Sequence, residues 1–254
     1  RFYCKIQIMK IAIFVEGQSE LILTKEFLLA MHDYCDVRIE CYALLCDVPK
    51  DVDYPFGAPN ASNHYMIINV GNDNSVLSNM KSRINGLKKK GYDKVVGLRD
   101  MYSEAYLKKN NNQRTINPEL IKLFVSISQE EINRLDFAER AKFCWAIMEV
   151  EAWFLGMKHL FESVNPILTS DYIKSQLGYD LENADPETTY CHPAKVVGEI
   201  MGLAGKQYRK REGEVKSLVS CLTKDHYEEL MNSDVCSTFT SYAKELLEDT
   251  EIYQ

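Results

Sequence analysis

Residues 10–20, KIAIFVEGQSE, decide how the first part of this chain folds. Residues 10–15 have the length of a strand and are apolar from residue 11 onward, and the run ends directly at the carboxylate of Glu16. A glycine then permits a sharp turn, and residues 19–31 carry the wide apolar face of a helix that packs on a sheet. In open α/β sheets, ligands bind in the crevice at the carboxyl ends of the strands. We therefore expect Glu16 to lie in such a crevice, with Glu20 pointing back toward it from the first helical turn.

Two later segments repeat this arrangement of an apolar run followed by acids. VVGLRDMY brings Asp100 to the end of an expected strand at residues 94–98. FCWAIMEVEAW brings Glu149 and Glu151 to the end of an expected strand at residues 142–150. Carboxylates gathered at neighbouring strand ends form an acidic cluster, and such a cluster is typical of a site for a hard divalent cation. The sequence therefore predicts a site for Mg²⁺ or Mn²⁺.

Each acid also has a simpler interpretation. Glu16 is equally a surface acid before a helix, where carboxylates are favoured, and Asp100 is a strand terminator beside Arg99. If Glu149 is still in the strand, it shares a face with Glu151, and the two carboxylates then need a cation or a proton between them. Alternatively, both lie in the strand-to-helix turn, with Glu151 as the first acid of the helix.

The order of expected elements indicates an α/β fold with a mainly parallel sheet flanked by helices. The remaining expected strands are residues 37–45 and 64–70, and residues 47–63 read as one long loop. The expected helices are residues 19–31, a helix from Asn74 or Ser75 to about Lys90, residues 118–125, a second helix starting at Ser128, and residues 151–160. From about residue 166 there is no convincing strand. We expect an α/β domain at residues 9–165 and an all-helical C-terminal extension at residues 166–254.

Composition narrows the function classes. The chain has 254 residues and a formal net charge of −7, so nucleic acid would be bound through a local patch or through metal ions. No apolar run approaches the ~18 residues of a membrane span, and no membrane partner is expected. The eight cysteines include no CxxC pair and lack the spacing of zinc sites, and scattered thiols of this kind indicate a reducing cytoplasm.

Basic residues near the C-terminal end are candidates for contacts with phosphate. The stretch KQYRKREGEVK at residues 206–216 is either a solvated face or a nucleic-acid contact. Its candidates for binding nucleic acid are Lys206, Arg209, Lys210 and Arg211. Lys195, in HPAKVV, and Lys206 are the candidates for a cation that neutralises charge developing in a transition state.

Taken in order, VEGQSE, LRDMY, MEVEAWFL, HPAKVV and STFTSYAKELL resemble the motifs of the Toprim fold, the metal-binding module of topoisomerases, primases and OLD-type nucleases. More narrowly, they are similar to small stand-alone Toprim-like proteins, many of them encoded beside an ABC-type ATPase in bacterial anti-phage loci. The motifs cover roughly residues 9–250. The resemblance implies a metal-dependent nuclease that acts as a defence effector and is controlled by an ATPase partner.

The resemblance also implies roles for the acids. Glu16 matches the family's general acid/base or metal-binding glutamate, and Glu20 matches the second acid of the OLD-type branch. Asp100 matches the first aspartate of the family's DxD motif. Glu149 and Glu151 match its later acidic motif.

Tyr102 departs from the family pattern, since it stands where the DxD motif has its second aspartate. Either Glu104 or the Glu149/Glu151 pair replaces the missing ligand, or one metal binds tightly, or the site is catalytically impaired. The first hypothesis is a Mg²⁺- or Mn²⁺-dependent nuclease acting on DNA or RNA, including tRNA. The second is a catalytically impaired interaction subunit of an ATPase complex. A phosphatase or nucleotidyl-transfer enzyme would use the same acids on smaller substrates.

Overall fold

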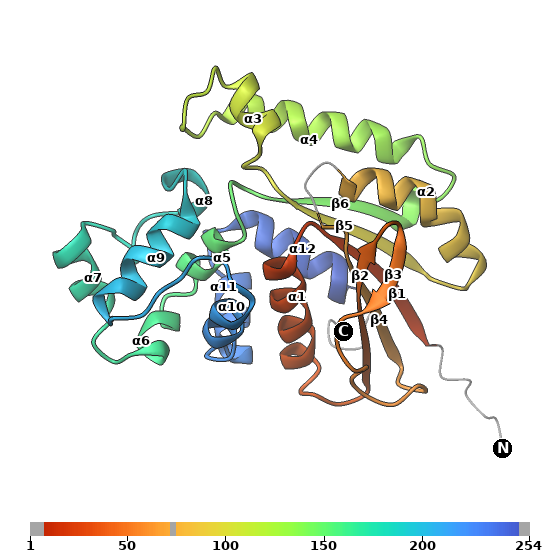
Figure 1. The fold of residues 1–254 in the computed structure, drawn as a ribbon, viewed down its shortest axis with the longest axis horizontal. Helices are drawn as coiled ribbons and strands as arrows, with labels where there is room; N and C mark the ends of the chain where they lie inside the picture. The colour runs from red at the N-terminus through yellow and green to blue at the C-terminus, as the bar shows by residue number, and fades with distance from the viewer. Residues whose placement is uncertain (1–7, 72–74, 249–254) are drawn as a thin grey trace. The chain divides into compact units, whose positions relative to one another are not determined.

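The computed structural model describes residues 8–71 and 75–248 and confirms the α/β fold with its mostly parallel sheet (Figure 1). The strands are β1 (Met9–Val15), β2 (Val37–Leu45), β3 (Val48–Asp51), β4 (Asn63–Asn69), β5 (Lys94–Asp100) and β6 (Ala141–Ala146). They form one six-stranded sheet in the order β3-β2-β4-β1-β5-β6. β2, β4, β1 and β5 run parallel, and β3 pairs antiparallel with β2 at the edge.

Helices connect the parallel strands and then make up the C-terminal region. The connecting helices are α1 (Gln18–Met31), α2 (Val76–Lys89), α3 (Glu104–Lys109) and α4 (Pro118–Asn133), with a 3₁₀ turn, η2, at Ala138–Arg140. The later helices are α5 (Glu151–Gly156), α6 (Leu160–Val164), α7 (Ser170–Leu177), α8 (Pro186–Thr189), α9 (Pro193–Leu203), α10 (Glu212–Val219), α11 (Lys224–Met231) and α12 (Ser237–Leu247). The expected C-terminal helical region is thus confirmed as far as residue 248, and residues 249–254 lie outside the described part. No helix among the described residues is both long and apolar enough to cross a bilayer.

The central strand β1 is buried on both faces, as its apolar run predicts. Ala12 and Phe14 share one buried cluster with residues of α2. Since successive side chains of a strand alternate between its faces, Ile11 and Ile13 point to the other face, in register with Tyr65 and Ile67 of β4. α1 packs against β4 and β2 (Figure 1). A strand enclosed in this way holds the turn that follows it in a fixed place.

The structure corrects three sequence expectations. The expected loop at 47–63 contains β3, because Cys46 and Asp47 both adopt left-handed backbone angles and close a two-residue hairpin. α4 is one helix rather than two, with Ser128 buried within it instead of capping a new one. β6 ends at Ala146 rather than Val150, and a turn follows it.

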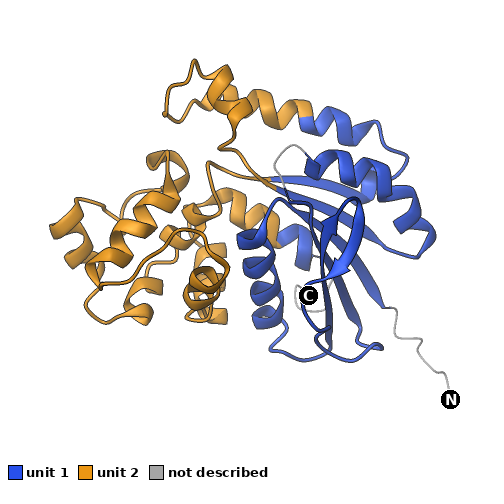
Figure 2. Cartoon of the chain, in the orientation of Figure 1, with its two compact units in different colours: residues 1–98, 128–144, 244–254 blue, residues 99–127, 145–243 orange. Residues whose placement is uncertain are grey.

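The chain divides into two compact units (Figure 2). Unit 1 comprises residues 1–98, 128–144 and 244–254, and unit 2 comprises residues 99–127 and 145–243. Unit 1 holds most of the sheet. Unit 2 holds the last two residues of β5 and the segment that follows them, the end of β6, and most of the C-terminal helices. The domain boundary between residues 165 and 166 stays a prediction.

The packing of β5 generates a stability test at Gly97. A Cβ at this position would collide with the Met80 sulfur and would lie 2.9 Å from the Phe143 ring. We expect Gly97→Ala to lower the free energy of unfolding by about 1–3 kcal/mol, since overpacking forces neighbouring side chains to move. Urea denaturation followed by circular dichroism measures the change.

Gly86 in α2 is the matched control, because a Cβ there meets nothing within 4 Å. Gly86→Ala should raise the free energy of unfolding by about 0.5–1 kcal/mol through the lower backbone entropy of the unfolded chain. Equal effects of the two substitutions would contradict this description of the β5 packing.

Candidate functional site

The candidate site forms within unit 2, where β5 and β6 end. Asp100 is the last residue of β5. Beyond it, backbone pairing between the two segments continues, with Met101 N–H donating to Ala146 O at 2.9 Å and Tyr102 N–H donating to Met148 O at 2.8 Å. The continued pairing ties the backbone on either side of the acids to one frame.

The turn after β6 positions the two glutamates. Met148 adopts a left-handed backbone with φ of 63°, which ends the strand alternation two residues after β6. Glu149 lies in this turn, and Glu151 is the first residue of α5. The interpretation with both acids in a strand-to-helix turn is therefore confirmed, and the placement of Glu149 within a strand is wrong.

Asp100, Glu149 and Glu151 are all buried, and Glu151 is 0% exposed. One oxygen of each carboxylate accepts a hydrogen bond from the surrounding chain. The donors are Val150 N–H to Asp100 Oδ1 at 2.9 Å, Ala194 N–H to Glu149 Oε2 at 2.9 Å, and Tyr208 O–H to Glu151 Oε1 at 2.7 Å. These hydrogen bonds orient each carboxylate through one oxygen, and the second oxygen of each points toward Lys210.

The second oxygens of the three carboxylates share one neighbour, the ammonium of Lys210. Its Nζ lies 3.6 Å from Asp100 Oδ2, 3.1 Å from Glu149 Oε1 and 2.9 Å from Glu151 Oε2. The Glu151 Oε2 atom is buried and accepts no hydrogen bond of good geometry, so its close contact with Nζ is mainly electrostatic. We call the three buried carboxylates of Asp100, Glu149 and Glu151 the carboxylate cradle. The single positive charge of Lys210 faces all three of them.

Lys210 reaches the cradle from the loop between α9 and α10. Its side chain is 32% exposed, and its backbone is left-handed with φ of 56°. Such a conformation costs of order 1–3 kcal/mol for a residue other than glycine and is found where other interactions hold it. Tyr208, two residues earlier, is buried and donates to the same glutamate that Lys210 approaches. The two contacts fix the loop to the cradle.

Tyr102, at the position of the missing aspartate, pairs with His192. The phenol oxygen lies 2.6 Å from His192 Nε2, and the rings meet edge to face with centroids 4.2 Å apart. Burial lowers the pKa of His192 and raises the pKa of Tyr102, so both side chains are neutral at pH 7. A neutral phenol engaged in this way does not substitute for a carboxylate ligand. Glu104 is exposed at the start of α3.

Glu16 and Glu20 belong to unit 1. Glu20 is buried in the first turn of α1, and its Oε2 would lie 3.1 Å from a Cβ placed on Gly17. The glycine thus leaves room for Glu20 to turn back over the residue that follows Glu16, which confirms the expected direction of this side chain. Glu16 is half-buried directly after β1. The participation of both acids in a metal site stays a prediction.

The other basic candidates have different surroundings. Lys195 Nζ lies 3.4 Å from Glu199 Oε1 with a side chain that is 72% exposed, and Lys206 Nζ donates to Val164 O at 3.1 Å. Arg209 and Arg211 are exposed, and their backbone N–H groups donate to Glu214 at the start of α10. Of the four cations predicted from residues 206–216, Lys210 is therefore the one that the structure places against the cradle. The roles predicted for the others stay predictions.

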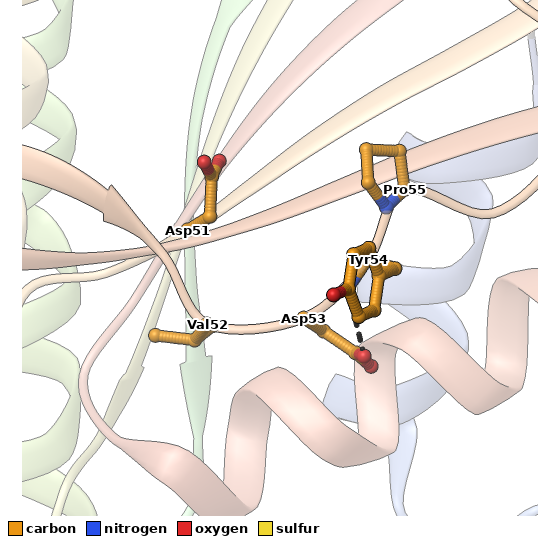
Figure 3. A pocket seen from close by; sticks show the side chains of 5 residues that line it. All are labelled: Asp51, Val52, Asp53, Tyr54 and Pro55. Atoms are coloured by element: carbon orange, nitrogen blue, oxygen red, sulfur yellow. Dashed lines mark hydrogen bonds between the residues drawn. The ribbon is translucent and has the colours of Figure 1, made fainter.

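A hollow in unit 1 lies apart from these residues in the chain. It is lined by Asp51, the last residue of β3, and by the next four residues, Val52, Asp53, Tyr54 and Pro55 (Figure 3). Asp53 pairs with Lys25 of α1 and accepts a hydrogen bond from Tyr54 N–H at 2.9 Å. None of the residues predicted for the site lines this hollow.

The three carboxylates of the cradle have the donor chemistry of a divalent-cation site but not its preformed arrangement. Across the described ranges 8–71 and 75–248, no group of three His, Cys, Asp or Glu side chains has the arrangement of a preformed metal site. The chemistry of the donors nevertheless fits one, since carboxylate oxygens are the preferred ligands of Mg²⁺ and Mn²⁺. The Lys210 ammonium marks the point on which three of these oxygens converge, and the buried Glu151 Oε2 accepts no hydrogen bond there. The cradle therefore fits a hard cation that takes the place of the ammonium.

The sequence did not reveal every residue that contacts the cradle. Ala194 acts through its backbone N–H in the first turn of α9, and no side-chain pattern predicts that. Tyr208 lies in the basic stretch at 206–216, where an aromatic residue two positions before Lys210 was the available signal. Lys210 itself was predicted only as a contact for nucleic acid.

Neither a protein-family model nor a curated protein sequence matches this chain. Among solved structures, the chain is similar to the C-terminal region of the Burkholderia pseudomallei OLD protein, with 13% sequence identity and a TM-score of 0.42. The similarity covers 93% of this chain and 96% of that one. Similarity at this level carries no functional assignment.

Removing the ammonium should destabilise unit 2. We expect Lys210→Met to lower the free energy of unfolding by roughly 2 kcal/mol or more, because three buried carboxylates lose their counter-charge. Urea denaturation at pH 7 without divalent cations measures it. Lys216→Met is the control, since Lys216 forms an exposed pair with Glu212 that is worth less than about 1 kcal/mol. Equal losses for the two variants would show that the cradle does not depend on Lys210.

Proposed function

We propose that this chain is a Mg²⁺- or Mn²⁺-dependent nuclease that cleaves phosphodiester bonds of DNA or RNA. The observation that carries the proposal is the cradle, in which three buried carboxylates each present one oxygen to a single cation position. Burying a carboxylate costs free energy, and buried carboxylates cluster at sites that bind a cation or a substrate.

The residues of unit 2 that would hold the metal are Asp100, Glu149 and Glu151, and Glu16 and Glu20 are further proposed ligands on the motif resemblance alone. When bound, a divalent cation supplies Lewis acidity toward a phosphoryl oxygen and lowers the pKa of a coordinated water. Val150 N–H, Ala194 N–H and the Tyr208 hydroxyl orient the three carboxylates of the cradle. Orientation of ligands by neighbouring donors is what keeps such a site ready for its cation.

Basic side chains of unit 2 would bind the nucleic acid. Lys206, Arg209, Lys210 and Arg211 lie within six residues of one another around the start of α10, and Arg209 and Arg211 are exposed. Positive side chains in such a cluster bind phosphate groups without reading sequence. Lys195 and Lys206 remain the proposed cations that neutralise charge developing on the phosphate.

The biological setting of the proposal comes from the resemblance of the sequence motifs. On that basis we propose that the protein is a cytoplasmic anti-phage effector, with DNA or RNA, including tRNA, as substrate. An ABC-type ATPase is the proposed controlling partner. This part of the proposal rests on the motif resemblance.

Nucleic-acid cleavage in the presence of Mn²⁺ or Mg²⁺ tests the activity. The purified chain should cleave DNA or RNA, and Asp100→Asn should reduce the rate by about 100-fold or more, since it removes a charged ligand. Glu212→Gln is the matched control, because Glu212 is an exposed acid of α10 that pairs with Lys216. Cleavage that is equally fast in Asp100→Asn would exclude the cradle as the catalytic centre.

A second candidate function is that of a catalytically impaired interaction subunit. It is favoured by Lys210, which already supplies a counter-charge to the cradle, and by the Tyr102–His192 pair at the position of a metal ligand in the family motif. In this case the acids would serve the stability of unit 2 and the chain would bind an ATPase without cleaving nucleic acid.

The melting temperature with and without Mn²⁺ separates the two functions. A metal at 100 times its dissociation constant adds about 2.7 kcal/mol of stability to the folded state, which should raise the melting temperature by several degrees. Glu151→Gln should lose this rise while keeping the shape of the side chain. An interaction subunit with a permanent Lys210 counter-ion should show no rise in either protein.

A further inference from the structure

Lys210 occupies the position that a metal ion would take in the cradle. Its Nζ lies 3.6 Å from Asp100 Oδ2, 3.1 Å from Glu149 Oε1 and 2.9 Å from Glu151 Oε2, at the point where these three oxygens converge. The opposite oxygens are held by Val150, Ala194 and Tyr208. An ammonium and a divalent cation would therefore compete for the same three oxygens.

We infer that Lys210 is an exchangeable internal counter-ion, which neutralises the cradle in the metal-free protein and leaves it when a divalent cation binds. The inference rests on the proposed metal site and adds the step by which the metal ion enters that site. Like charges repel strongly at contact distance in a buried site, so a metal that binds at this position requires the ammonium to move away from it. Exchange replaces one positive charge by two in front of three carboxylates, which favours the divalent ion.

The position of Lys210 in the chain suits it to leave. Its side chain is 32% exposed, while the side chains of Asp100 and Glu151 are 6% and 0% exposed. Asp100 is fixed at the end of β5 and Glu151 at the start of α5, whereas Lys210 lies in a loop with a left-handed backbone. Release of Lys210 would let this loop relax. Metal binding should therefore free one segment of the protein while it stabilises the rest.

Exchange also predicts how substitutions change metal affinity. Lys210→Met removes the competing charge, so its dissociation constant for Mn²⁺ should be about tenfold lower than that of the parent protein. Lys210→Arg keeps the charge and should remain within about threefold of the parent, by the same reasoning. Isothermal titration calorimetry with Mn²⁺ alone gives both constants, and equal affinities for the parent and Lys210→Met would overturn the inference.

Chemical labelling of the unmodified protein follows the exchange without any substitution. The full chain is treated briefly with an acetylating reagent, with and without saturating Mn²⁺, and the acetylation of each lysine is quantified by mass spectrometry. A minor open state is populated to at most about 10%, so acetylation of Lys210 should rise about tenfold when Mn²⁺ releases it. Lys174 is the internal control, since it is 53% exposed and pairs with a single carboxylate, Asp180, and its labelling should not change.

The outcomes of this labelling experiment are independent of nuclease activity. Increased acetylation of Lys210 in a protein that cleaves no nucleic acid would support exchange and overturn the proposed nuclease. Unchanged or reduced acetylation, while Mn²⁺ still raises the melting temperature, would overturn exchange and leave the nuclease untouched. Absence of any effect of Mn²⁺ on labelling and on melting would overturn exchange and identify Lys210 as a permanent counter-ion.

Discussion

The contact between the Lys210 ammonium and three buried carboxylates is the interaction on which the rest of the site depends. Buried carboxylates are costly unless a positive charge and hydrogen-bond donors compensate them. The chain supplies both kinds of compensation. A hydrogen-bond donor contacts one oxygen of each carboxylate, and the Lys210 ammonium faces the other oxygen of each. Removal of the ammonium leaves the hydrogen-bond donors in place but takes away the positive charge that faces the three carboxylates, so the cradle needs Lys210 or another cation in its place.

This requirement accounts for local features that are otherwise unusual. Met148 adopts a left-handed backbone in the turn after β6, and this turn carries Glu149 and leads into Glu151 at the start of α5. Lys210 is also left-handed, in a loop that Tyr208 anchors. The C-terminal helices are therefore part of the site, because the start of α9 and the loop before α10 supply its donors and its cation.

Much of the fold followed from local patterns, because apolar runs that end in an acid or a turn are strong signals for buried strands. β3 was missed, since its hairpin turn at Cys46 and Asp47 contains no glycine. Ser128 gave a capping signal that the continuous helix α4 overrode. The site was partly predictable for the same reason, as its acids follow strands. Lys210 could not be assigned to Asp100 from sequence, because the two are brought together only by tertiary packing.

Anomalous diffraction from crystals of the full chain soaked in Mn²⁺ tests the central claim most directly, because it locates the ion and the lysine together. The account predicts a manganese peak directly coordinated by carboxylate oxygens of Asp100, Glu149 and Glu151, with the Lys210 ammonium displaced from the cradle. A map with the ammonium still between the three carboxylates and no manganese beside them would contradict it. In that case the cradle would be a structural ion network.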